Sequence, residues 1–521
     1  MSITHAGAEA VPARGRAGRL RLPARWPQLA LALVCAVVAG LGMWQAAVDS
    51  LTIDEPVYIS AGLTALTRDD LRLNPQHPPL GKILAALPAL AAGPTLPNGP
   101  SWAHGKGRLY SESFNAQARR DGKLTEITTV SRVVPVIELV LTVLLVYALA
   151  RRLAGLPGGL FAAAMWGLNP FVLGIGHLDG IDLPFTLATL LSVLALVRWL
   201  EERTTSRLVL LGLACGAALL VRYTGPVVLA VAVVTVGVAS RKLRAPLIVG
   251  AVAVAVVWLF YAAFDPSYTF THANLLPQRY VDGVRALASA HAGAQDAFLL
   301  GHHWTGVRWW FWPVNWVIKL PVTLLLAFAL TPFFLKRAPF EQRRRVYAAV
   351  IPTAVALAVF TVATPDDRGL RYMLAVIALL CVCVAPLARA RRLMPVLLVA
   401  GSLAFVADSL PNVFSWTMPP FRPAYKYVTD ANLDWGQDVP DLQRWARGKQ
   451  PWIACYAPRG TGCIEDVPGA RRLRKFTPQS KVHGLVAISS TLQNLLEWHP
   501  WLRHEKQIGT VDGTIMLYRV P

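Results

Sequence analysis

Residues 29–48 read LALALVCAVVAGLGMWQAAV, a run of twenty residues without a charged side chain. An α-helix needs about 20 consecutive apolar residues to cross the hydrocarbon core of a bilayer, so this stretch predicts a membrane span. It lacks the small-residue cleavage site of a signal peptide, and we expect the span to be retained. Comparable apolar runs recur as far as Leu410. The sequence therefore predicts a mainly α-helical, polytopic membrane protein.

Composition agrees with this prediction. The chain has 521 residues, of which 54% are hydrophobic and only 16% are charged, and an ordinary soluble protein is less apolar. About eleven transmembrane helices are expected, near residues 28–48, 131–150, 157–176, 183–200, 208–222, 225–240, 246–264, 310–335, 346–363, 370–388 and 394–410.

The formal net charge of +21 raises the question of a nucleic-acid partner. The positive charge lies in short segments between the predicted spans, as the positive-inside rule requires of cytoplasmic loops. These basic clusters are Arg14 to Arg25, Arg151–Arg152, Arg203 with Arg207, Arg241 to Arg244, Lys336 to Arg345 and Arg389 to Arg392. Since no compact basic domain presents them, we predict no nucleic-acid partner, a cytoplasmic N-terminus and an exported C-terminus.

Three regions follow from this topology. Residues 1–27 form a basic cytoplasmic tail, and residues 28–410 form a transmembrane domain with a long first outer loop at 49–130. Residues 411–521 contain many charged and turn residues and form a separate extracytoplasmic domain.

The C-terminal region is expected to fold as a small α/β domain. Strand-like pieces occur at Leu485 to Ser489 and Thr514 to Val520. Cys455 and Cys463 lie eight residues apart in this exported region, where a disulfide can form. Two free thiols are the alternative, and we predict the disulfide.

The first outer loop begins with two adjacent carboxylates. Residues 52–58 read TIDEPVY, which places Asp54 and Glu55 at the outer membrane interface, before a helix that Pro56 can start. Helix capping alone accounts for such acids. Near a phosphate site, the same acids would instead indicate transfer chemistry.

The next motif supplies that phosphate site. Residues 73–82 read LNPQHPPLGK and lead into an apolar helix, Gly81 to Ala92, which is too short to span and is expected at the interface. A lysine in the first turn of a helix favours an anion. Taken singly, Lys82 fits a snorkelling residue and His77 a turn residue.

Further charges lie at the outer ends of predicted spans. Asp179 and Asp182 lie where the third span gives way to the fourth, and acids near membrane ends usually face water or a partner. Arg222, Lys319 and Arg371 are cations on the outer side, against the positive-inside tendency. An anionic ligand there would explain them.

These motifs resemble a known family. The Asp-Glu pair, the NPQHPPLGK loop and the Asp182-Leu-Pro stretch look like the phospholipid-carrier-dependent glycosyltransferases, which include the protein O-mannosyltransferases and the aminoarabinose transferase of lipid A. Three further stretches are similar to bacterial members: WWFWP at 309–313 followed by KLP at 319–321, RGLRY at 368–372 and DANLDWGQD at 430–438.

The resemblance implies a membrane fold of the GT-C type and a set of site residues. Asp54 matches the catalytic aspartate, Glu55 its neighbour, and Lys82 a ligand of the carrier phosphate. Asp182 matches the second acid of the family, with Asp179 as the alternative. Substrate contacts are further expected from His77, Arg222, Lys319 and Arg371.

The resemblance also implies the partners and the compartment. The donor would be a polyprenyl phosphate-linked hexose or pentose in a bacterial cytoplasmic (inner) membrane, and the acceptor, whether protein, lipid or glycan, stays open. Gln76 replaces the glutamate that is common before the His-Pro-Pro of this family, which removes one potential metal ligand. A divalent metal is possible at such a site, but no obligatory metal or other cofactor is predicted.

The expected mechanism needs cations near the phosphate leaving group and a carboxylate, Asp54, that takes the proton of the acceptor hydroxyl. A transporter or flippase for an anionic lipid-linked substrate is the main alternative, but broken spans and an internal repeat, which are typical of transporters, are not evident in the sequence. A scaffold subunit with an exported binding domain is a third possibility, which leaves the outer cations unexplained.

Overall fold

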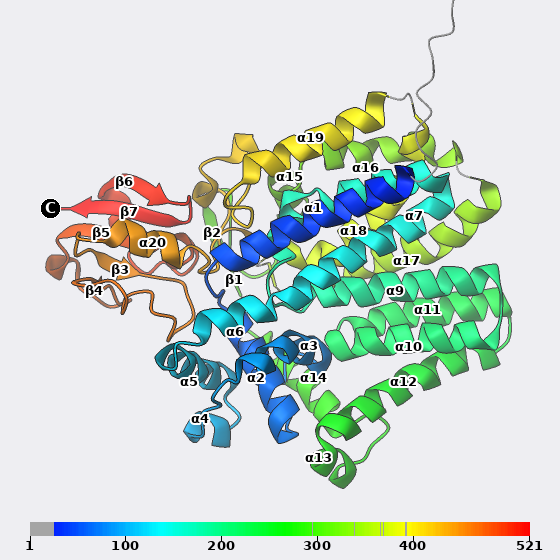
Figure 1. Cartoon of the computed structure of the whole chain (residues 1–521), viewed down its shortest axis with the longest axis horizontal. Helices are drawn as coiled ribbons and strands as arrows, with labels where there is room; N and C mark the ends of the chain where they lie inside the picture. Colours follow the sequence, from blue (N-terminus) through cyan, green and yellow to red (C-terminus); the bar gives the residue numbers. More distant parts are fainter. Residues whose placement is uncertain (1–25, 294, 338, 365, 368, 391–392) are drawn as a thin grey trace, which may run out of the picture.

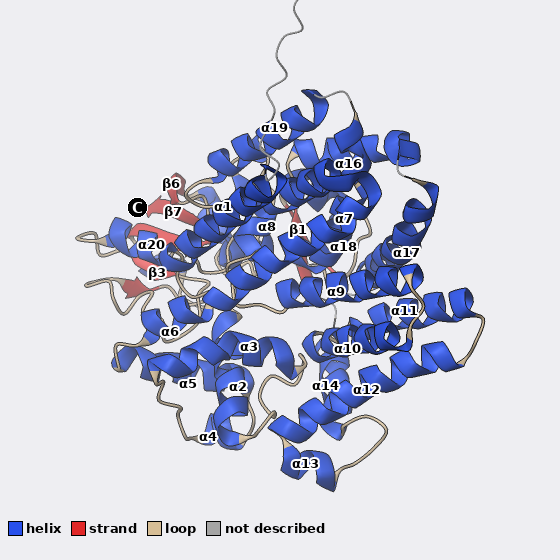
Figure 2. Cartoon of the chain, turned by 45° about the vertical axis from the view of Figure 1, so that its right-hand side comes forward, coloured by secondary structure: helices blue, strands red, loops and turns tan. Residues whose placement is uncertain are grey.

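The computed structural model describes residues 26–293, 295–337, 339–364, 366–367, 369–390 and 393–521. Most of the basic tail predicted for residues 1–27 therefore lies outside the described residues, as does Arg368. The chain is mainly helical. The strands of its C-terminal sheet gather at one side of the molecule, whereas the short strand pair Asp296–Leu299 and His302–Thr305 lies nearer the middle (Figures 1 and 2).

Six helical stretches are long and apolar enough to cross a membrane, or seven if a bent pair counts as one span. The six are Trp26–Val48 (α1), Leu124–Gly167 (α6 with α7), Asp182–Glu201 (α9), Arg244–Phe264 (α12), Phe340–Ala363 (α17) and Leu370–Arg389 (η3, α18 and η4). The chain is thus a multi-pass membrane protein.

The helix α7, Val133–Gly167, is a hairpin. Its backbone leaves the helical region at Ala154 and Gly155, where Gly155 has a φ of 70°. The two halves fold back on each other: the Trp166 indole N–H donates to the Thr142 hydroxyl over 2.9 Å, which a straight helix would not allow. This turn fits the two separate spans predicted for 131–150 and 157–176, and the short helix α8, Pro170–Ile175, extends the second half.

The span predicted for residues 310–335 is broken, a feature that the sequence analysis did not anticipate. Helices α15, Phe311–Lys319, and α16, Val322–Phe334, meet at an angle of 118°. Pro321 has no N–H to donate and disfavours helical geometry at the residue before it, so the helix stops there.

Three further predicted spans are shorter helices: α10, Thr205–Val221; α11, Gly225–Ser240; and α19, Leu393–Ser409. At 1.5 Å per residue, 17 residues reach about 26 Å, slightly less than the roughly 30 Å hydrocarbon core. Eleven transmembrane helices therefore remain a prediction.

Residues 49–130, the predicted first outer loop, fold into short helices packed against the bundle. They are α2, Glu55–Arg68; α3, Pro79–Ala89, with η1, Leu90–Ala92; α4, Pro100–Ala103; α5, Gly107–Arg120; and α6, Leu124–Ser131. Gly62 lets α2 approach α3 closely, because a Cβ at this position would lie 2.0 Å from the Lys82 carbonyl oxygen.

A second segment outside the predicted spans follows α12. It contains α13, Pro266–Thr271, α14, Gln278–Ala290, and a two-stranded antiparallel sheet of β1, Asp296–Leu299, and β2, His302–Thr305. Gly283 brings α14 against Tyr223 and Pro75, since a Cβ there would overlap the Tyr223 hydroxyl at 1.7 Å.

The C-terminal region contains a five-stranded sheet in the order β4-β3-β5-β7-β6. Its strands are β3, Trp452–Ala454; β4, Arg471–Arg472; β5, Gly484–Ser489; β6, Lys506–Val511; and β7, Ile515–Val520. β3 is parallel to β4 and β5, whereas β7 is antiparallel to β5 and β6. β5 and β7 lie where strands were predicted, and α20, Val439–Ala446, packs on one face of the sheet.

The other face of the sheet joins the hydrophobic core of the bundle, which includes Val486, Ile488 and Tyr518. Backbone contacts tie the same region to the start of the first outer loop, because the Ser50 N–H donates to the Gln437 carbonyl over 2.9 Å. The sheet is therefore docked at one end of the helical bundle (Figure 1).

Candidate active site

The carboxylate of Asp54 is not used as a helix cap. Asp54 stands at the N-cap position of α2, but its side chain makes no capping hydrogen bond. Instead, its Oδ2 lies 3.3 Å from Nη1 of Arg371, and about a third of the side chain stays exposed. The geometry thus disfavours the capping interpretation of this residue.

The neighbouring Glu55 has the opposite environment. Its buried carboxylate accepts two hydrogen bonds from Arg132, at 2.7 and 2.8 Å, and further bonds from Thr52 and from the Asp179 N–H. Burial alone would raise the pKa of Glu55, but the charge of Arg132 and the hydrogen bonds outweigh it and lower this pKa. Glu55 is directed into the protein and fixes the start of α2.

A chain of alternating charges runs from Asp54 into the bundle. Asp182 Oδ1 lies 2.6 Å from Nη1 of Arg222, and its Oδ2 lies 3.7 Å from Nη1 of Arg371. Arg371 thus contacts both Asp182 and Asp54. Asp182 begins α9, Arg222 follows α10 and Arg371 precedes α18, so these helix ends meet at one place.

Aromatic rings hold the two arginines. The Arg371 guanidinium lies 4.1 Å from the centre of the Trp435 ring, and that of Arg222 lies 4.8 Å from the centre of Tyr372. Stacking of this kind orients a guanidinium group while leaving its N–H donors available. Arg371 Nε is buried and has no hydrogen-bond partner among the described residues.

These groups line one cavity of about 980 Å³. Of the residues predicted for the site, the cavity is lined by Asp54, His77, Asp182, Arg222 and Arg371. A volume of this size lies at the upper end for ligand sites and is large enough for a sugar with a phosphate group.

Lys82 and Lys319 do not line this cavity, and Lys82 instead lines a smaller pocket of about 200 Å³ beside it. The Lys82 ammonium donates to the carbonyls of Leu73, Asn74 and His77. An ammonium has three donors, so these carbonyls use all of them. Lys82 therefore holds the 73–77 loop in place.

Lys319 is used in the same way. It is 1% exposed and donates to the carbonyls of Phe414, Trp416 and Asn432 at distances of 2.5–3.0 Å. Lys319 is the last residue of α15, so these hydrogen bonds join the break between α15 and α16 to the C-terminal region.

The geometry distinguishes the two candidate acids of the 177–182 segment. Asp182 lines the cavity, whereas Asp179 is buried with both carboxylate oxygens unpaired among the described residues. Burial, followed by the charge of Glu55, raises the pKa of Asp179 well above its ordinary value.

His77 faces the cavity beside Tyr58, and burial together with nearby cations lowers the pKa of His77, so its imidazole is neutral.

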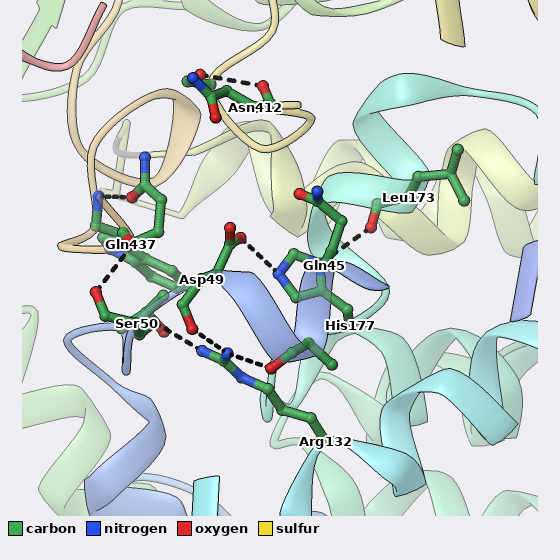
Figure 3. A network of polar contacts seen from close by, with 12 residues as sticks. Gln45, Asp49, Ser50, Arg132, Leu173, His177, Asn412 and Gln437 are labelled. Atoms are coloured by element: carbon green, nitrogen blue, oxygen red, sulfur yellow. Dashed lines mark hydrogen bonds and ion pairs between the residues drawn. The ribbon is translucent and has the colours of Figure 1, made fainter. Parts of the chain in front are cut away.

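A second network supports the segment before Asp54 (Figure 3). Arg132 donates to the carbonyls of Asp49 and Ser50 over 2.7 and 2.8 Å, and His177 Nε2 lies 2.9 Å from the Asp49 carboxylate. These contacts fix the chain between α1 and α2, and thereby the position of Asp54.

Sequence reasoning missed several residues of the cavity wall. They are Tyr58, His291, Asp366, Tyr372, Trp435 and Tyr456. Two of them lie inside the quoted motifs RGLRY and DANLDWGQD, but only the charged residue Arg371 had been selected from these motifs. Aromatic side chains beside outer cations were the missed signal.

One group of described carboxylates is close enough to share a cation. Asp438, Asp441 and Asp512 bring ligand atoms within 4.8 Å of one another near α20. This group is separate from the residues that line the cavity. In the cavity, Asp54 and Asp182 are paired with arginines.

One family model matches part of the chain. Residues 125–263 match the family model described as dolichyl-phosphate-mannose-protein mannosyltransferase. None of the curated proteins matches the chain in sequence.

Solved structures give distant likenesses. ArnT from Cupriavidus metallidurans, in a crystal structure bound to undecaprenyl phosphate, aligns at 11% identity and a TM-score of 0.45 over 95% of this chain and 98% of that chain. The oligosaccharyltransferase of Archaeoglobus fulgidus aligns at 13% identity and a TM-score of 0.44 over 90% of this chain and 68% of that one. The S. cerevisiae Pmt1-Pmt2 protein O-mannosyltransferase complex aligns at 16% identity and a TM-score of 0.31, over 55% of this chain and 39% of that one.

Alignments at such scores carry no argument about the site, which rests on its own geometry. The family match supports a membrane glycosyltransferase. It also confirms the resemblance that the motifs predicted: over residues 125–263 the chain carries the sequence pattern of the dolichyl-phosphate-mannose-protein mannosyltransferases.

Proposed function

We propose that this protein transfers a sugar from a polyprenyl phosphate-linked donor to an acceptor hydroxyl at the extracytoplasmic membrane surface. The observation that carries the proposal is the charge chain Asp54–Arg371–Asp182–Arg222, which brings the partly exposed carboxylate of Asp54 and two cations into one cavity.

The two arginines are the proposed phosphate ligands. The leaving group of such a donor is already an anion, so cations that stabilise it matter more than a general acid. The unpaired Nε of Arg371 is a donor that a phosphate oxygen would satisfy. Because Lys82 and Lys319 have no donor left, we assign them to loop positioning instead of direct phosphate binding.

Asp54 is the proposed base. The acceptor oxygen attacks the anomeric carbon while its proton passes to the Asp54 carboxylate. The bond between that carbon and the phosphate oxygen breaks, and its electron pair stays on the polyprenyl phosphate. Asp182 positions both arginines, and Glu55 positions the segment that carries Asp54.

The cavity also offers an apolar side for the lipid. Val284 and Leu287 of α14 face this space together with Leu357 and Phe360 of α17. A prenyl chain leaving the phosphate between these two helices would remain in contact with apolar surface.

The orientation is proposed on three grounds. The charged residues of the cavity lie at one end of the spans, and the basic clusters among the described residues lie at the opposite end. Cys455 and Cys463 form a disulfide. We accordingly place residues 411–521 and the 49–130 loop outside a bacterial cytoplasmic membrane. The matched family is named after dolichyl phosphate mannose, which supports mannose as the first sugar to test.

The break between α15 and α16 is the feature closest to a transporter. However, Lys319 and the backbone carbonyls of the C-terminal region fill it, and the cavity is lined by other residues. The break therefore does not favour transport.

Binding and turnover of the purified protein test the proposal. Undecaprenyl phosphate should bind, and Arg222→Gln should weaken binding about 10–100-fold, because one charge-assisted contact is lost. Arg151→Gln, at the exposed turn of α7, is the matched control and should leave the affinity unchanged. In the turnover assay, the protein should release undecaprenyl phosphate from undecaprenyl phosphate–mannose as the sugar is transferred. Equal affinity in both variants, or binding without release from any polyprenyl phosphate-sugar, contradicts the proposal.

A further inference from the structure

The disulfide loop of the C-terminal region forms part of the cavity wall. Cys455 and Cys463 are joined across a sequence separation of eight residues, and Tyr456, directly after the first cysteine, lines the cavity. Trp435, which stacks on Arg371, is its neighbour in the wall. A Cβ on Gly436 would lie 2.6 Å from the Tyr456 carbonyl oxygen, so the two segments are in close contact.

The same loop is fastened to α5 of the first outer loop. The Asn115 amide donates to the Arg459 carbonyl over 3.1 Å, and Arg459 Nη1 lies 3.6 Å from Glu112. Gly460 packs so closely that a Cβ there would lie 2.8 Å from the Ala116 nitrogen. Just beyond the disulfide, Arg119 and Asp466 form an ion pair.

The N-terminal end of α5 forms another part of the cavity wall. Residues 105–109 line the cavity, and Lys106 and Arg108 are exposed there. The disulfide loop thus contributes one wall segment directly, through Tyr456, and holds a second one through α5.

This wall is distinct from the apolar side of the cavity. β3, which leads into Cys455, is a strand of the C-terminal sheet, and α5 lies on the same side of the molecule, whereas α17 lies on the side away from the sheet (Figure 1). If the prenyl chain leaves between α14 and α17, as the proposed function requires, the acceptor approaches from the side of Tyr456.

We propose that the Cys455–Cys463 loop is the acceptor-side wall of the active site, with Tyr456 as a positioning residue for the acceptor and the disulfide as the fastener of both wall segments. This inference rests on the proposed function for the meaning of "acceptor", but the fastening of α5 is independent of it.

The first experiment tests the fastening alone. Hydrogen–deuterium exchange of residues 107–120 is compared in the full-length protein before and after reduction by a phosphine. Exchange should rise on reduction in the wild-type protein and in the control Cys35→Ser. It should already be raised, without reductant, in the double variant Cys455→Ser/Cys463→Ser. Unchanged exchange on reduction overturns the inference whether or not the protein transfers sugar.

The second experiment tests the acceptor wall. Mannose transfer from labelled undecaprenyl phosphate–mannose to the acceptors of isolated membranes is measured against membrane amount. Tyr456→Ala should raise the apparent KM for membrane acceptor about fivefold. Its Kd for undecaprenyl phosphate should stay within about twofold, and Tyr456→Phe should restore the KM, because the ring forms the wall.

The outcomes separate the two proposals. A wild-type protein that neither binds undecaprenyl phosphate nor transfers the label contradicts the proposed function, while the exchange experiment still decides the fastening. An unchanged acceptor KM in Tyr456→Ala, or an equal loss of donor affinity, overturns the acceptor wall while the proposed function stands.

Discussion

Asp54 and Glu55 are adjacent in sequence, and their amides should separate catalysis from stability. Asp54→Asn keeps the size of the side chain but removes a base at neutral pH. General-base catalysis contributes about 10²–10⁴ in rate, which corresponds to about 3–5 kcal/mol of activation free energy. The contact of Asp54 with Arg371, at 3.3 Å and with the carboxylate 35% exposed, is worth no more than about 1 kcal/mol of folding free energy.

Glu55→Gln should show the reverse pattern. The Glu55–Arg132 pair is fully buried, with side chains 1% and 0% exposed. Removing one charge from such a pair costs about 3–5 kcal/mol of folding free energy. We therefore expect a marked drop in Tm for Glu55→Gln and a Tm near that of the wild type for Asp54→Asn.

The assay combines release of undecaprenyl phosphate from its mannose ester with thermal unfolding of the same samples. Residual activity is compared per folded molecule, so that unfolding of Glu55→Gln is not mistaken for a catalytic defect. Near-normal turnover in Asp54→Asn would refute the base assignment. A stable but inactive Glu55→Gln protein would show instead that the buried acid takes part in the chemistry.

Four other outcomes are expected. Lys82→Met should lower the Tm, since each loop carbonyl left unpaired costs about 1–3 kcal/mol, and the folded fraction should still bind undecaprenyl phosphate with wild-type Kd. Trp435→Ala should weaken undecaprenyl phosphate binding about tenfold by releasing Arg371, with Trp435→Phe retaining most of the affinity. Burial raises the pKa of Asp438 well above its ordinary value, so its stabilising contribution is complete below about pH 4 and is lost as pH rises through the raised pKa. Asp438→Asn should therefore flatten the dependence of Tm on pH. A reporter active only in the cytoplasm should be silent when fused after Pro521, and strong activity would invert the proposed topology.

The helices were largely predictable because bilayer thickness imposes a minimum apolar length on each span. The predicted 183–200 and 246–264 became α9 and α12 with boundaries shifted by only a few residues. The bend between α15 and α16 was not predicted, since a hydropathy average includes Pro321 without registering it and carries no information on the direction of the helix axis. Docking of the sheet on the bundle was not predicted either, because alternation within a strand does not identify the surface that covers it.

The site was predictable where charge stands out against an apolar background. Asp182, Arg222 and Arg371 were selected because their charge is unusual at an outer helix end, and the structure brings them together. The same reasoning misjudged the surroundings of Lys82 and Lys319, whose partners are backbone carbonyls without any sequence signature. Contacts between residues far apart in the sequence, such as Trp435 with Arg371, likewise depend on the fold.

The backbone pairing between residues 50–53 and 435–437 has a consequence for biogenesis. Ser50 and Ile53 donate their N–H groups to carbonyls that leave the ribosome almost 400 residues later. Until the last segment has been synthesised and translocated, the strand-like edge before Asp54 has no partner and the wall formed by Trp435 is missing. If the proposed function holds, we expect a nascent chain to be inactive throughout its insertion, with activity beginning only when translation is nearly complete.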